Sequence, residues 1–548
     1  MRYIKILTIL SLTATMLLQS CDESFLELDQ PIYPALETYY TDSATAFEGL
    51  VGCYNSFTNY NTGESTLRYI WHLDTRSDDT DYAGNPRGVV EEQNYYIASG
   101  FSNFDILADN THAYGVWEYC YNGVNTINKY LEGMNSTSFP VSQQPLVEQY
   151  KAEAKVIRSY FYFLLVKNFG PVVLYTNSLS QDEWYSQSRQ EESLVYAQIF
   201  KDLREAKELL PLRSDYGDAM YGRITKAAAQ TLLAKALITE AEIDGSSPNW
   251  QEAYDLCREV ELSGEYNLNT LHEDMWKVAG QFSSEFILDI IVDEAFDSEK
   301  DSYIHGLSPR YYFDANGVPK HDRKLEFGFG ISGITEDMAN QYGYYQGYDS
   351  LQWVNLTDSR GKITFWTRWE RYTDEQYIIV DELTSRPETT NPHATDDANY
   401  YQQKYSREKL ATLYWSAGSN MHLIRYAETL LIAAEAAYYL GNEEEARRLV
   451  NMIRERAFRP AINDGRTTLA EVEINSSGKQ LLEDIWQERR LELAGEADRF
   501  HDLKRTHRLH ILKEKKPEIL FQEGKHELLP IPASELALAP NLTQNPGY

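Results

Sequence analysis

The sequence predicts a mainly α-helical protein, in which helical hairpins form a right-handed superhelical scaffold beside an irregular, loop-rich lobe with short strands. Three observations favour this fold class. Many segments repeat apolar residues at helical spacing. Two stretches, about 61–111 and 265–418, lack that spacing and are rich in Gly, Asp, Asn and aromatic residues. Two Ala-rich segments also resemble each other in the way that stacked helical hairpins do.

The N-terminus has the pattern of a bacterial lipoprotein signal. Two basic residues lead into an apolar run, Ile4–Leu18, which is short for a membrane span but suits a signal peptide. Leu17–Cys21 (LLQSC) resembles a lipobox. We therefore expect residues 1–20 to be removed, Cys21 to carry a lipid, and residues 21–35 to act as a tether. The alternative is an ordinary secretory signal that happens to contain a cysteine.

Composition excludes several classes of function. The 548 residues include 51 Lys+Arg and 83 Asp+Glu, a formal charge of −32, which would repel a nucleic-acid backbone. No polybasic segment is present to hold an anionic membrane surface, so membrane attachment must come from the lipid. Beyond Cys21 only Cys53, Cys120 and Cys257 remain, which indicates neither a disulfide framework nor a CxxC metal site.

The aromatic content favours a protein that binds a partly polar ligand. The chain has 41 Tyr against 20 Phe, and tyrosine combines an apolar face with a hydroxyl group that suits wet interfaces. Sugars offer the matching surface, an apolar C–H face surrounded by hydroxyls. Packing of these rings between helices, with the hydroxyl in water, is the structural alternative.

The scaffold is expected in three parts, 36–60, 112–264 and 419–505, of a single domain that covers residues 36–548. Amphipathic spacing predicts helices at 41–60, 112–134, 147–169, 192–211, 225–243, 249–264, 419–441, 442–457 and 479–505. Short strands are expected in the lobe at 286–292 and 376–383. The proline-rich C-terminus, 506–548, is expected to form an extended wrap.

Two of these segments echo each other. Residues 231–260 and 430–457 each contain an Ala-rich helix, a turn, and a second helix that begins with Glu-Ala followed by Leu three residues on. Small residues on the first helix let the second approach closely, as in tetratricopeptide-type hairpins. Two unrelated hairpins that share common helix-forming residues would give the same pattern.

Several motifs together resemble the SusD/RagB family of Bacteroidetes outer-membrane lipoproteins. They are the lipobox followed by DESFLELDQP, and the segments AEAKVIRSYFYFLLVKNFGPVVL, LIRYAETLLIAAEAAYYLG, VNMIRERA, IWQERRLELAGEADRFHDLKR and LLPIPASELALAPNLTQNPGY. The resemblance implies four tetratricopeptide-type helix pairs and a lipid anchor on the outer membrane, facing the cell exterior. Asp22 and Glu23 resemble the family's surface-export signal.

The resemblance also implies a function. Such proteins bind an oligosaccharide and deliver it to a SusC-like TonB-dependent transporter, with no catalytic activity and no cofactor. Their binding face comes from loops that correspond here to about 68–96 and 300–370. Within these loops the candidates for ligand contact are Asp78, Tyr82, Asn85, Arg87, Arg310, Tyr311, Tyr312, Tyr344, Tyr345 and Trp353. Aromatic faces can stack on sugar rings, while Asn and Arg can bond vicinal hydroxyls.

Other functions stay open at this point. A binder of peptides or glycopeptides would serve the same transporter role, and a scaffold would only stiffen the transporter complex. A surface glycoside hydrolase has no local motif to support it, since paired acids arise by chance in so acidic a chain. The Asp-rich stretch 74–81 offers oxygen ligands for a structural calcium ion, without EF-hand spacing, and no other metal is expected.

Overall fold

The computed structural model describes residues 39–58, 73–82, 100–217, 221–241, 243, 245–291, 312–313, 319–320, 332–344, 355–366, 370–373, 376–379, 401–402, 404 and 420–548. The expected signal peptide, Cys21 and the tether lie outside these residues. None of the helices in the described part combines the length and apolarity needed to cross a membrane.

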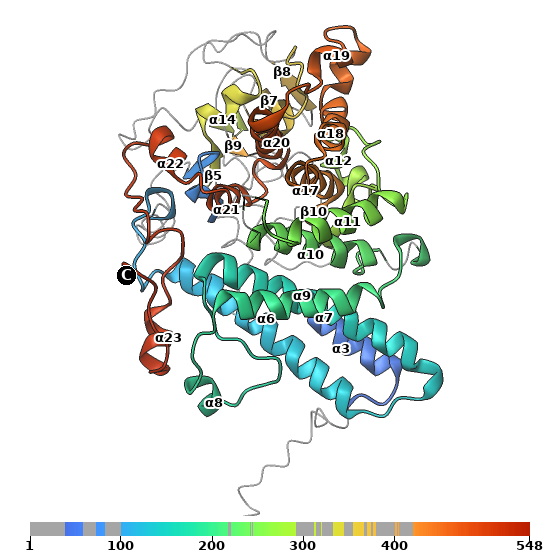
Figure 1. The fold of residues 1–548 in the computed structure, drawn as a ribbon, viewed down its shortest axis with the longest axis vertical. Coiled ribbons are helices and arrows are strands. Elements are labelled where there is room, and N and C mark those ends of the chain that lie inside the picture. Colours follow the sequence, from blue (N-terminus) through green and yellow to red (C-terminus); the bar gives the residue numbers. More distant parts are fainter. Residues whose placement is uncertain are drawn as a thin grey trace, which may run out of the picture.

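Long helices stacked in chain order form the body of the molecule (Figure 1). From α6 onward each packs on its predecessor: α7 on α6, α9 on α7, α10 on α9, α11 on α10, α17 on α11 and α18 on α17. The main helices are α3 (Ser43–Asn55), α6 (Thr111–Ser136), α7 (Gln144–Phe169), α9 (Glu192–Lys207), α10 (Lys226–Glu240), α11 (Asn249–Leu262), α17 (Tyr426–Tyr439), α18 (Glu443–Asn463), α20 (Gly478–Leu493) and α21 (Arg499–Arg505).

The remaining elements are short. The helices are η2 (Leu73–Arg76), η3 (Val141–Gln143), α8 (Gln181–Tyr185), η4 (Arg213–Asp215), α12 (His272–Met275), η6 (Val278–Gly280), α14 (Glu336–Gln341), α16 (Gly361–Thr364), α19 (Leu469–Val472), α22 (His510–Lys515) and α23 (Ala533–Leu538). The strands are β1 (Thr80–Tyr82), β2 (Phe286–Ile290), β3 (Tyr312–Phe313), β4 (Pro319–Lys320), β5 (Ser332–Ile334), β6 (Phe365–Trp366), β7 (Glu370–Thr373), β8 (Gln376–Ile379), β9 (Tyr401–Gln402) and β10 (Met421–Arg425).

The predicted fold class is confirmed: the chain is mainly helical, and its strands are few and short. The two echoing segments form the hairpins α10–α11 and α17–α18, which stack on each other through α11 and α17. Alanines on α10 and α17 are buried and allow this close approach. Between α10 and α17 the hydroxyl groups of Thr231 and Thr429 lie 3.1 Å apart, within hydrogen-bond distance.

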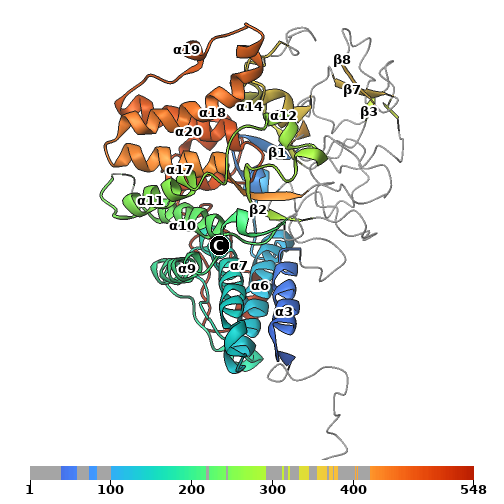
Figure 2. The same ribbon diagram turned by 90° about the vertical axis from the view of Figure 1, so that its right-hand side faces the viewer.

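The lobe is inserted between α11 and α17, and a two-stranded ribbon closes its base. β2 runs antiparallel to β10, with Met421 opposite Ile290 and Arg425 opposite Phe286, so the chain leaves and returns at one place. Figure 2 shows the helical stack along one side of the molecule and the lobe's strands β3, β7 and β8 on the other. Three described strands of the lobe also form a four-stranded sheet with β1, which precedes α6 in the chain, in the order β1-β5-β9-β6.

Two expected helices differ from the structure. The helix expected at 419–441 begins only at Tyr426, because residues 421–425 pair with β2 instead. The helix expected at 479–505 is broken into α20 and α21 by a turn in which Gly495 and Ala497 adopt left-handed φ angles of 75° and 65°. A continuous helix cannot include such residues, and after the turn α21 contacts η2.

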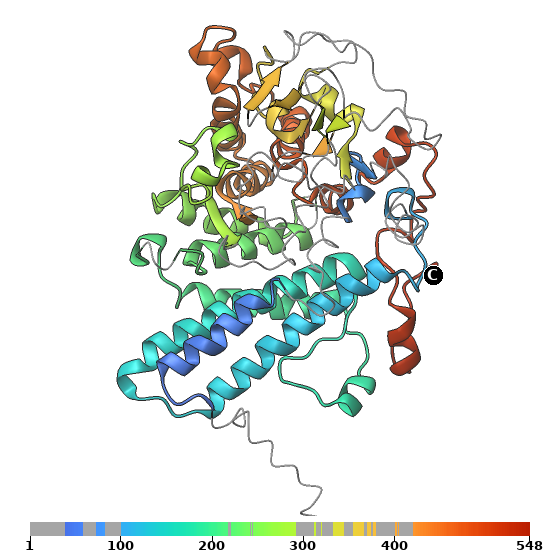
Figure 3. The same ribbon diagram turned by 180° about the vertical axis from the view of Figure 1, so that it is seen from behind.

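The C-terminal segment runs back over the N-terminal half of the chain. Figure 3 shows it beside the start of α6, far from it in sequence. Backbone hydrogen bonds join Leu520 N–H to the Asn103 carbonyl (2.9 Å) and Leu529 N–H to the Asn168 carbonyl (2.7 Å). α22 and α23 interrupt this otherwise irregular segment, which was expected to be extended throughout.

Candidate functional site

The two loop regions expected to bind ligand meet at a β-ladder. β1, at the end of the described part of the first region, pairs antiparallel with β5 from the second region. Thr80 lies opposite Ile334, and Tyr82 lies opposite Ser332. Segments about 250 residues apart in sequence are therefore joined by backbone hydrogen bonds, and the loops that continue from both strands start from one place.

Arginines from the scaffold hold the segment that leads into β1. The guanidinium of Arg499 donates to both carboxylate oxygens of Asp78, at 2.8 and 2.9 Å. Arg490 donates through Nε to Asp79 (2.6 Å) and through Nη2 to Asp337 of α14 (2.8 Å). Arg490, on α20, thus bridges both loop regions, since Asp79 comes from the first and Asp337 from the second.

The two neighbouring aspartates differ in the direction of their pKa shifts. Burial alone would raise the pKa of Asp78, but Arg499 and Arg490 outweigh it and hold that pKa below its usual value. Burial dominates at Asp79, whose pKa is raised despite Arg490 and with a contribution from the charge of Asp78. Asp78 is therefore the firmly ionised member of the pair and the main partner of Arg499.

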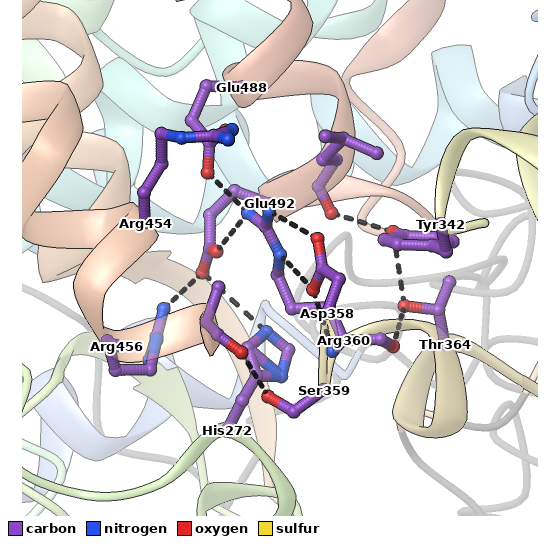
Figure 4. A network of polar contacts seen from close by, with 12 residues as sticks. His272, Tyr342, Asp358, Ser359, Arg360, Thr364, Arg454, Arg456, Glu488 and Glu492 are labelled. Atoms are coloured by element: carbon purple, nitrogen blue, oxygen red, sulfur yellow. Dashed lines mark hydrogen bonds and ion pairs between the residues drawn. The ribbon is translucent and has the colours of Figure 1, made fainter. Parts of the chain in front are cut away.

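A second, larger group of buried charges joins the lobe to the helices (Figure 4). Arg360, just before α16, donates through Nη2 to Asp358 (2.7 Å) and through Nη1 to Glu488 (2.6 Å) and Glu492 (3.1 Å) of α20. Arg456 of α18 donates to Glu492 as well, and to Glu285 beside β2 at 2.6 Å. We call this group the junction network.

The junction network also includes residues at the ends of the inserted lobe. Arg425, the last residue of β10, donates to Glu285 (2.9 Å), Glu492 (2.5 Å) and Glu496 (2.8 Å). Lys404, from inside the lobe, donates to Glu496 at 2.6 Å, and burial lowers its pKa to about 8. The lobe is thus tied to α20 and the turn that follows it at several separate points.

Charges in the junction network cancel. Within the described residues, five basic side chains face five acidic ones: Arg360, Arg425, Arg454, Arg456 and Lys404 against Glu285, Asp358, Glu488, Glu492 and Glu496. His272 lies beside Glu492, and burial lowers the pKa of its imidazole well below the usual value, so it adds no charge. Balanced charges with many hydrogen bonds can be buried, whereas burial of an unpaired charge costs folding free energy.

The structure separates the predicted site residues. Asp78 is 1% exposed and bonded to Arg499, and Tyr344 is 2% exposed with its ring edge-to-face on Phe365. Both are part of the interior in this structure, in contrast to the exposed ligand contacts that were expected. The physical reason is that arginine pairing and ring packing bury them.

The other predicted contacts are described only in part or not at all. Tyr82 and Tyr312 are described through their backbone, in β1 and β3. Asn85, Arg87, Arg310, Tyr311, Tyr345 and Trp353 lie outside the described residues. Their role in ligand binding stays a prediction.

Two of the carboxylates considered for calcium are used by arginines instead. Asp78 and Asp79 pair with Arg499 and Arg490, so the charge that a cation would balance is already balanced. No group of three or more His, Cys, Asp or Glu side chains suited to hold a metal ion occurs among the described residues.

Sequence reasoning missed these arginines as organisers of the site. Glu488 and Glu492 lie four residues apart on one face of α20 and accept from Arg360, while Arg490, on another face, donates to Asp79 and Asp337. The available signal was the density of charge in the helical segment IWQERRLELAGEADRF, on both sides of a turn that contains glycine. A helix that is charged on most faces is either solvated or buried through pairing, and only the partners decide which.

The fold and this charged framework define a tetratricopeptide-like helical scaffold that carries an inserted, loop-rich lobe at its charged junction. Comparison with known proteins identifies the family. A model described as the SusD family matches residues 308–548, and one described as starch-binding, associating with the outer membrane, matches residues 70–238. The chain belongs to the SusD/RagB family.

Individual relatives agree with this assignment. SusD-like protein P2 of Formosa agariphila is 26% identical over 474 residues, which cover 82% of this chain and 83% of the relative. A SusD-like protein from Bacteroides fragilis superposes with a TM-score of 0.72 at 21% identity, over 93% of this chain and 98% of the other. A solved laminarin-binding SusD-like protein matches with a TM-score of 0.69 at 25% identity, over 93% of this chain and all of the other.

Proposed function

We propose that this protein is a cell-surface lipoprotein that captures an oligosaccharide and delivers it to a SusC-like TonB-dependent transporter. The observation that carries the proposal is membership of the SusD/RagB family over both halves of the chain. The family model for residues 70–238 is described as starch-binding and outer-membrane associated, and one relative of the same fold is described as laminarin-binding. A glycan is accordingly the first class of ligand to test.

The binding face would be built by the loops that continue from β1 and β5. Their shared ladder brings Tyr82 next to Ser332 in the backbone, so side chains from both regions can act on one ligand. Ligand contacts are proposed for Tyr82, Asn85, Arg87, Arg310, Tyr311, Tyr312, Tyr345 and Trp353. The buried Asp78 and Tyr344 would support these loops from behind.

A binding panel tests this function. The mature chain is titrated calorimetrically with laminarin, starch, xylan, mannan and mucin glycans. Replacement of Tyr82, Asn85 and Arg87 together by Ala should weaken binding of the best glycan at least tenfold, since aromatic stacking and bidentate bonds would both be lost. Tyr185→Ala, in the distant α8, is the matched control and should bind as the wild type does.

The same panel separates the alternatives. A chain that binds peptides or glycopeptides but no free glycan is a peptide receptor in the same transporter role. Incubation with each glycan, followed by chromatography of the products, tests for a glycoside hydrolase: we expect no turnover. If the triple variant binds every glycan as the wild type does and supports the same nutrient uptake, the loops would have a scaffold role.

Attachment and partnership need separate experiments. Mass spectrometry of the membrane-extracted chain should find an acylated Cys21 at its N-terminus, and Cys21→Ser should release the protein from the outer membrane. Protease treatment of whole cells should digest the wild-type chain if it faces the exterior. Affinity purification from membranes should recover a SusC-like transporter of β-barrel size with the tagged protein.

A further inference from the structure

A cavity of about 280 Å³ lies outside the loops assigned to the ligand, between the start of α10 and the base of the lobe. One wall comes from the α9–α10 connection, another from the segment after α11, and a third from β2. Its lining residues are Arg213, Ser214, Tyr216, Gly217, Tyr221, Gly222, Arg223, Thr225, Glu265, Tyr266, Phe286, Ile287 and Asp289. A single six-membered sugar ring fits such a volume.

Both arginines in the lining already have hydrogen-bond partners. Arg213 donates to the carbonyl oxygens of Phe282 (2.9 Å), Ser283 (3.1 Å) and Phe286 (3.3 Å). Arg223 is paired through two nitrogens with the fully buried Glu153. Of the two, only Arg223 is balanced by a carboxylate, whereas Arg213 is held by neutral carbonyl oxygens.

Glu265, the first of the two acids, is also engaged. Its carboxylate accepts hydrogen bonds from the backbone N–H (2.9 Å) and the hydroxyl (2.6 Å) of Ser214. A cationic ligand would have to compete with these bonds. Since Arg223 is balanced by Glu153 outside the lining, the remaining lining charges are Arg213 against Glu265 and Asp289, a negative balance that disfavours an anionic ligand.

The guanidinium of Arg213 lies over two tyrosine rings of the cavity lining, 5.0 Å from the Tyr221 centroid and 5.7 Å from the Tyr266 centroid. Tyr221 is 39% exposed and contacts Phe282, itself 47% exposed, edge-to-face with ring centroids 4.6 Å apart. Tyr266 lines the interior, where its hydroxyl lies 3.1 Å from that of Thr225. Exposed rings at the rim and a polar interior match the alternation of C–H faces and hydroxyls on a pyranose.

Asp289 supplies a buried polar group for orientation. Its side chain is 7% exposed, and its Oδ1 lies 2.9 Å from Nδ1 of His422 on β10. The second oxygen, Oδ2, is not used by His422. A sugar hydroxyl that donates to Oδ2 would satisfy this acceptor.

We propose that this cavity is a second saccharide site that takes one neutral pyranose unit, with Tyr221 as its platform and Asp289 as the acceptor for a hydroxyl. The inference rests on the proposed glycan function but concerns a different place from the loops 68–96 and 300–370. A long glycan held by the loops and a terminal unit held here would engage the protein at two points.

Gly217 offers a way to fill the cavity without removing a contact. It lines the cavity, a Cβ there would meet no atom within 4 Å, and its φ lies outside the left-handed region, so Gly217→Leu introduces no backbone strain. Gly52→Leu on α3 is the matched control, because Gly52 also has open space around its Cβ and is remote from the cavity. Tyr221→Ala removes the platform, with Tyr185→Ala as its control.

Saturation-transfer NMR on the mature chain measures the site with glucose, galactose, mannose and xylose, and with inorganic phosphate as the anionic probe. We expect at least one monosaccharide to give a signal that falls at least fivefold in Gly217→Leu and in Tyr221→Ala. The signal should be unchanged in both controls and in the triple loop variant. Thermal melting curves that match the wild type establish that the variants fold.

Three results would overturn the inference. Monosaccharide signals equal to wild type in both cavity variants would exclude this cavity. If the signal is lost only in the triple loop variant, the proposed glycan function still stands. Binding of phosphate, but of no sugar, in a manner sensitive to Gly217→Leu would refute the neutral-ligand class. Absence of binding by any monosaccharide or longer glycan would refute both this site and the proposed glycan function.

Discussion

Glu492→Gln tests whether the junction network holds the lobe on the helical scaffold. The Glu492 carboxylate is fully buried and accepts hydrogen bonds from Arg425 (2.5 Å), Arg360 (3.1 Å) and Arg456. Glutamine keeps the shape of the side chain but removes its charge. The network then carries one uncompensated positive charge, and the new amide N–H groups face guanidinium groups that also only donate.

The expected magnitude follows from the cost of unpairing a buried charge. Removal of one partner of a buried ion pair costs about 3–5 kcal/mol. With an unfolding entropy of about 2.1 cal/mol/K per residue, the roughly 390 described residues contribute about 0.8 kcal/mol/K, so Tm should fall by about 4–6 °C. Glu444→Gln, an exposed glutamate in the first turn of α18, is the matched control and should shift Tm by less than about 0.5 °C.

The pH dependence gives a second test. Burial alone would raise the pKa of Glu492, but Arg456 and Arg425 outweigh it and hold the pKa well below its usual value. A depressed carboxyl pKa contributes stability that is complete above the unfolded pKa of about 4.3 and is lost as pH falls below it. The stability difference between wild type and Glu492→Gln should therefore be largest near neutral pH and shrink in acid.

Calorimetric and urea-induced unfolding of both variants, at pH 7 and at pH 3.5, provides the assay. A Glu492→Gln protein that melts together with Glu444→Gln at pH 7 would refute the reasoning that this buried charge is needed. A difference that stays constant down to pH 3.5 would show that the loss comes from packing rather than charge.

Three further predictions concern the surroundings of the site. Ala497 has a left-handed φ of 65°, so Ala497→Gly should raise the unfolding free energy by roughly 0.5–1 kcal/mol. Ala44→Gly in the helix α3 should lower the unfolding free energy instead. Urea titration measures both changes, and a loss of stability at both positions would contradict the strain argument. Burial, with the charges of Asp79 and Asp498, raises the pKa of Asp74 to about 8, which means that the folded chain keeps a proton that the unfolded chain releases above about pH 4. Stability should thus decline from about pH 5 to pH 8 in the wild type and less steeply in Asp74→Asn, and parallel curves would count against the raised pKa. The Tyr54 hydroxyl accepts from the backbone N–H of Ile224 (2.7 Å) and donates to Glu153 (2.6 Å). Tyr54→Phe should therefore lower the unfolding free energy by about 1–3 kcal/mol, measured by denaturant titration. A loss below about 0.5 kcal/mol would show that water replaces the hydroxyl.

The sequence alone predicted the helical scaffold because helix formation and amphipathic spacing are local properties. Residues 147–169 show this well: the apolar spacing and the Gly170-Pro171 stop predicted a helix that the structure places at Gln144–Phe169, with Gly170 at a φ of 70°. The Ala-rich echo likewise predicted two hairpins, and α10–α11 and α17–α18 are the result. Family motifs spread along the chain added the expected function.

Only the tertiary structure decided which charged residues are interior. Asp78 was expected to be exposed to ligand, yet Arg499, more than 400 residues later, pairs with it and buries it. Met421–Arg425 continues an apolar pattern that favours a helix, yet it forms β10 because β2 offers a partner strand. In both cases the deciding interaction comes from a distant part of the chain, and local spacing carries no information about such a partner.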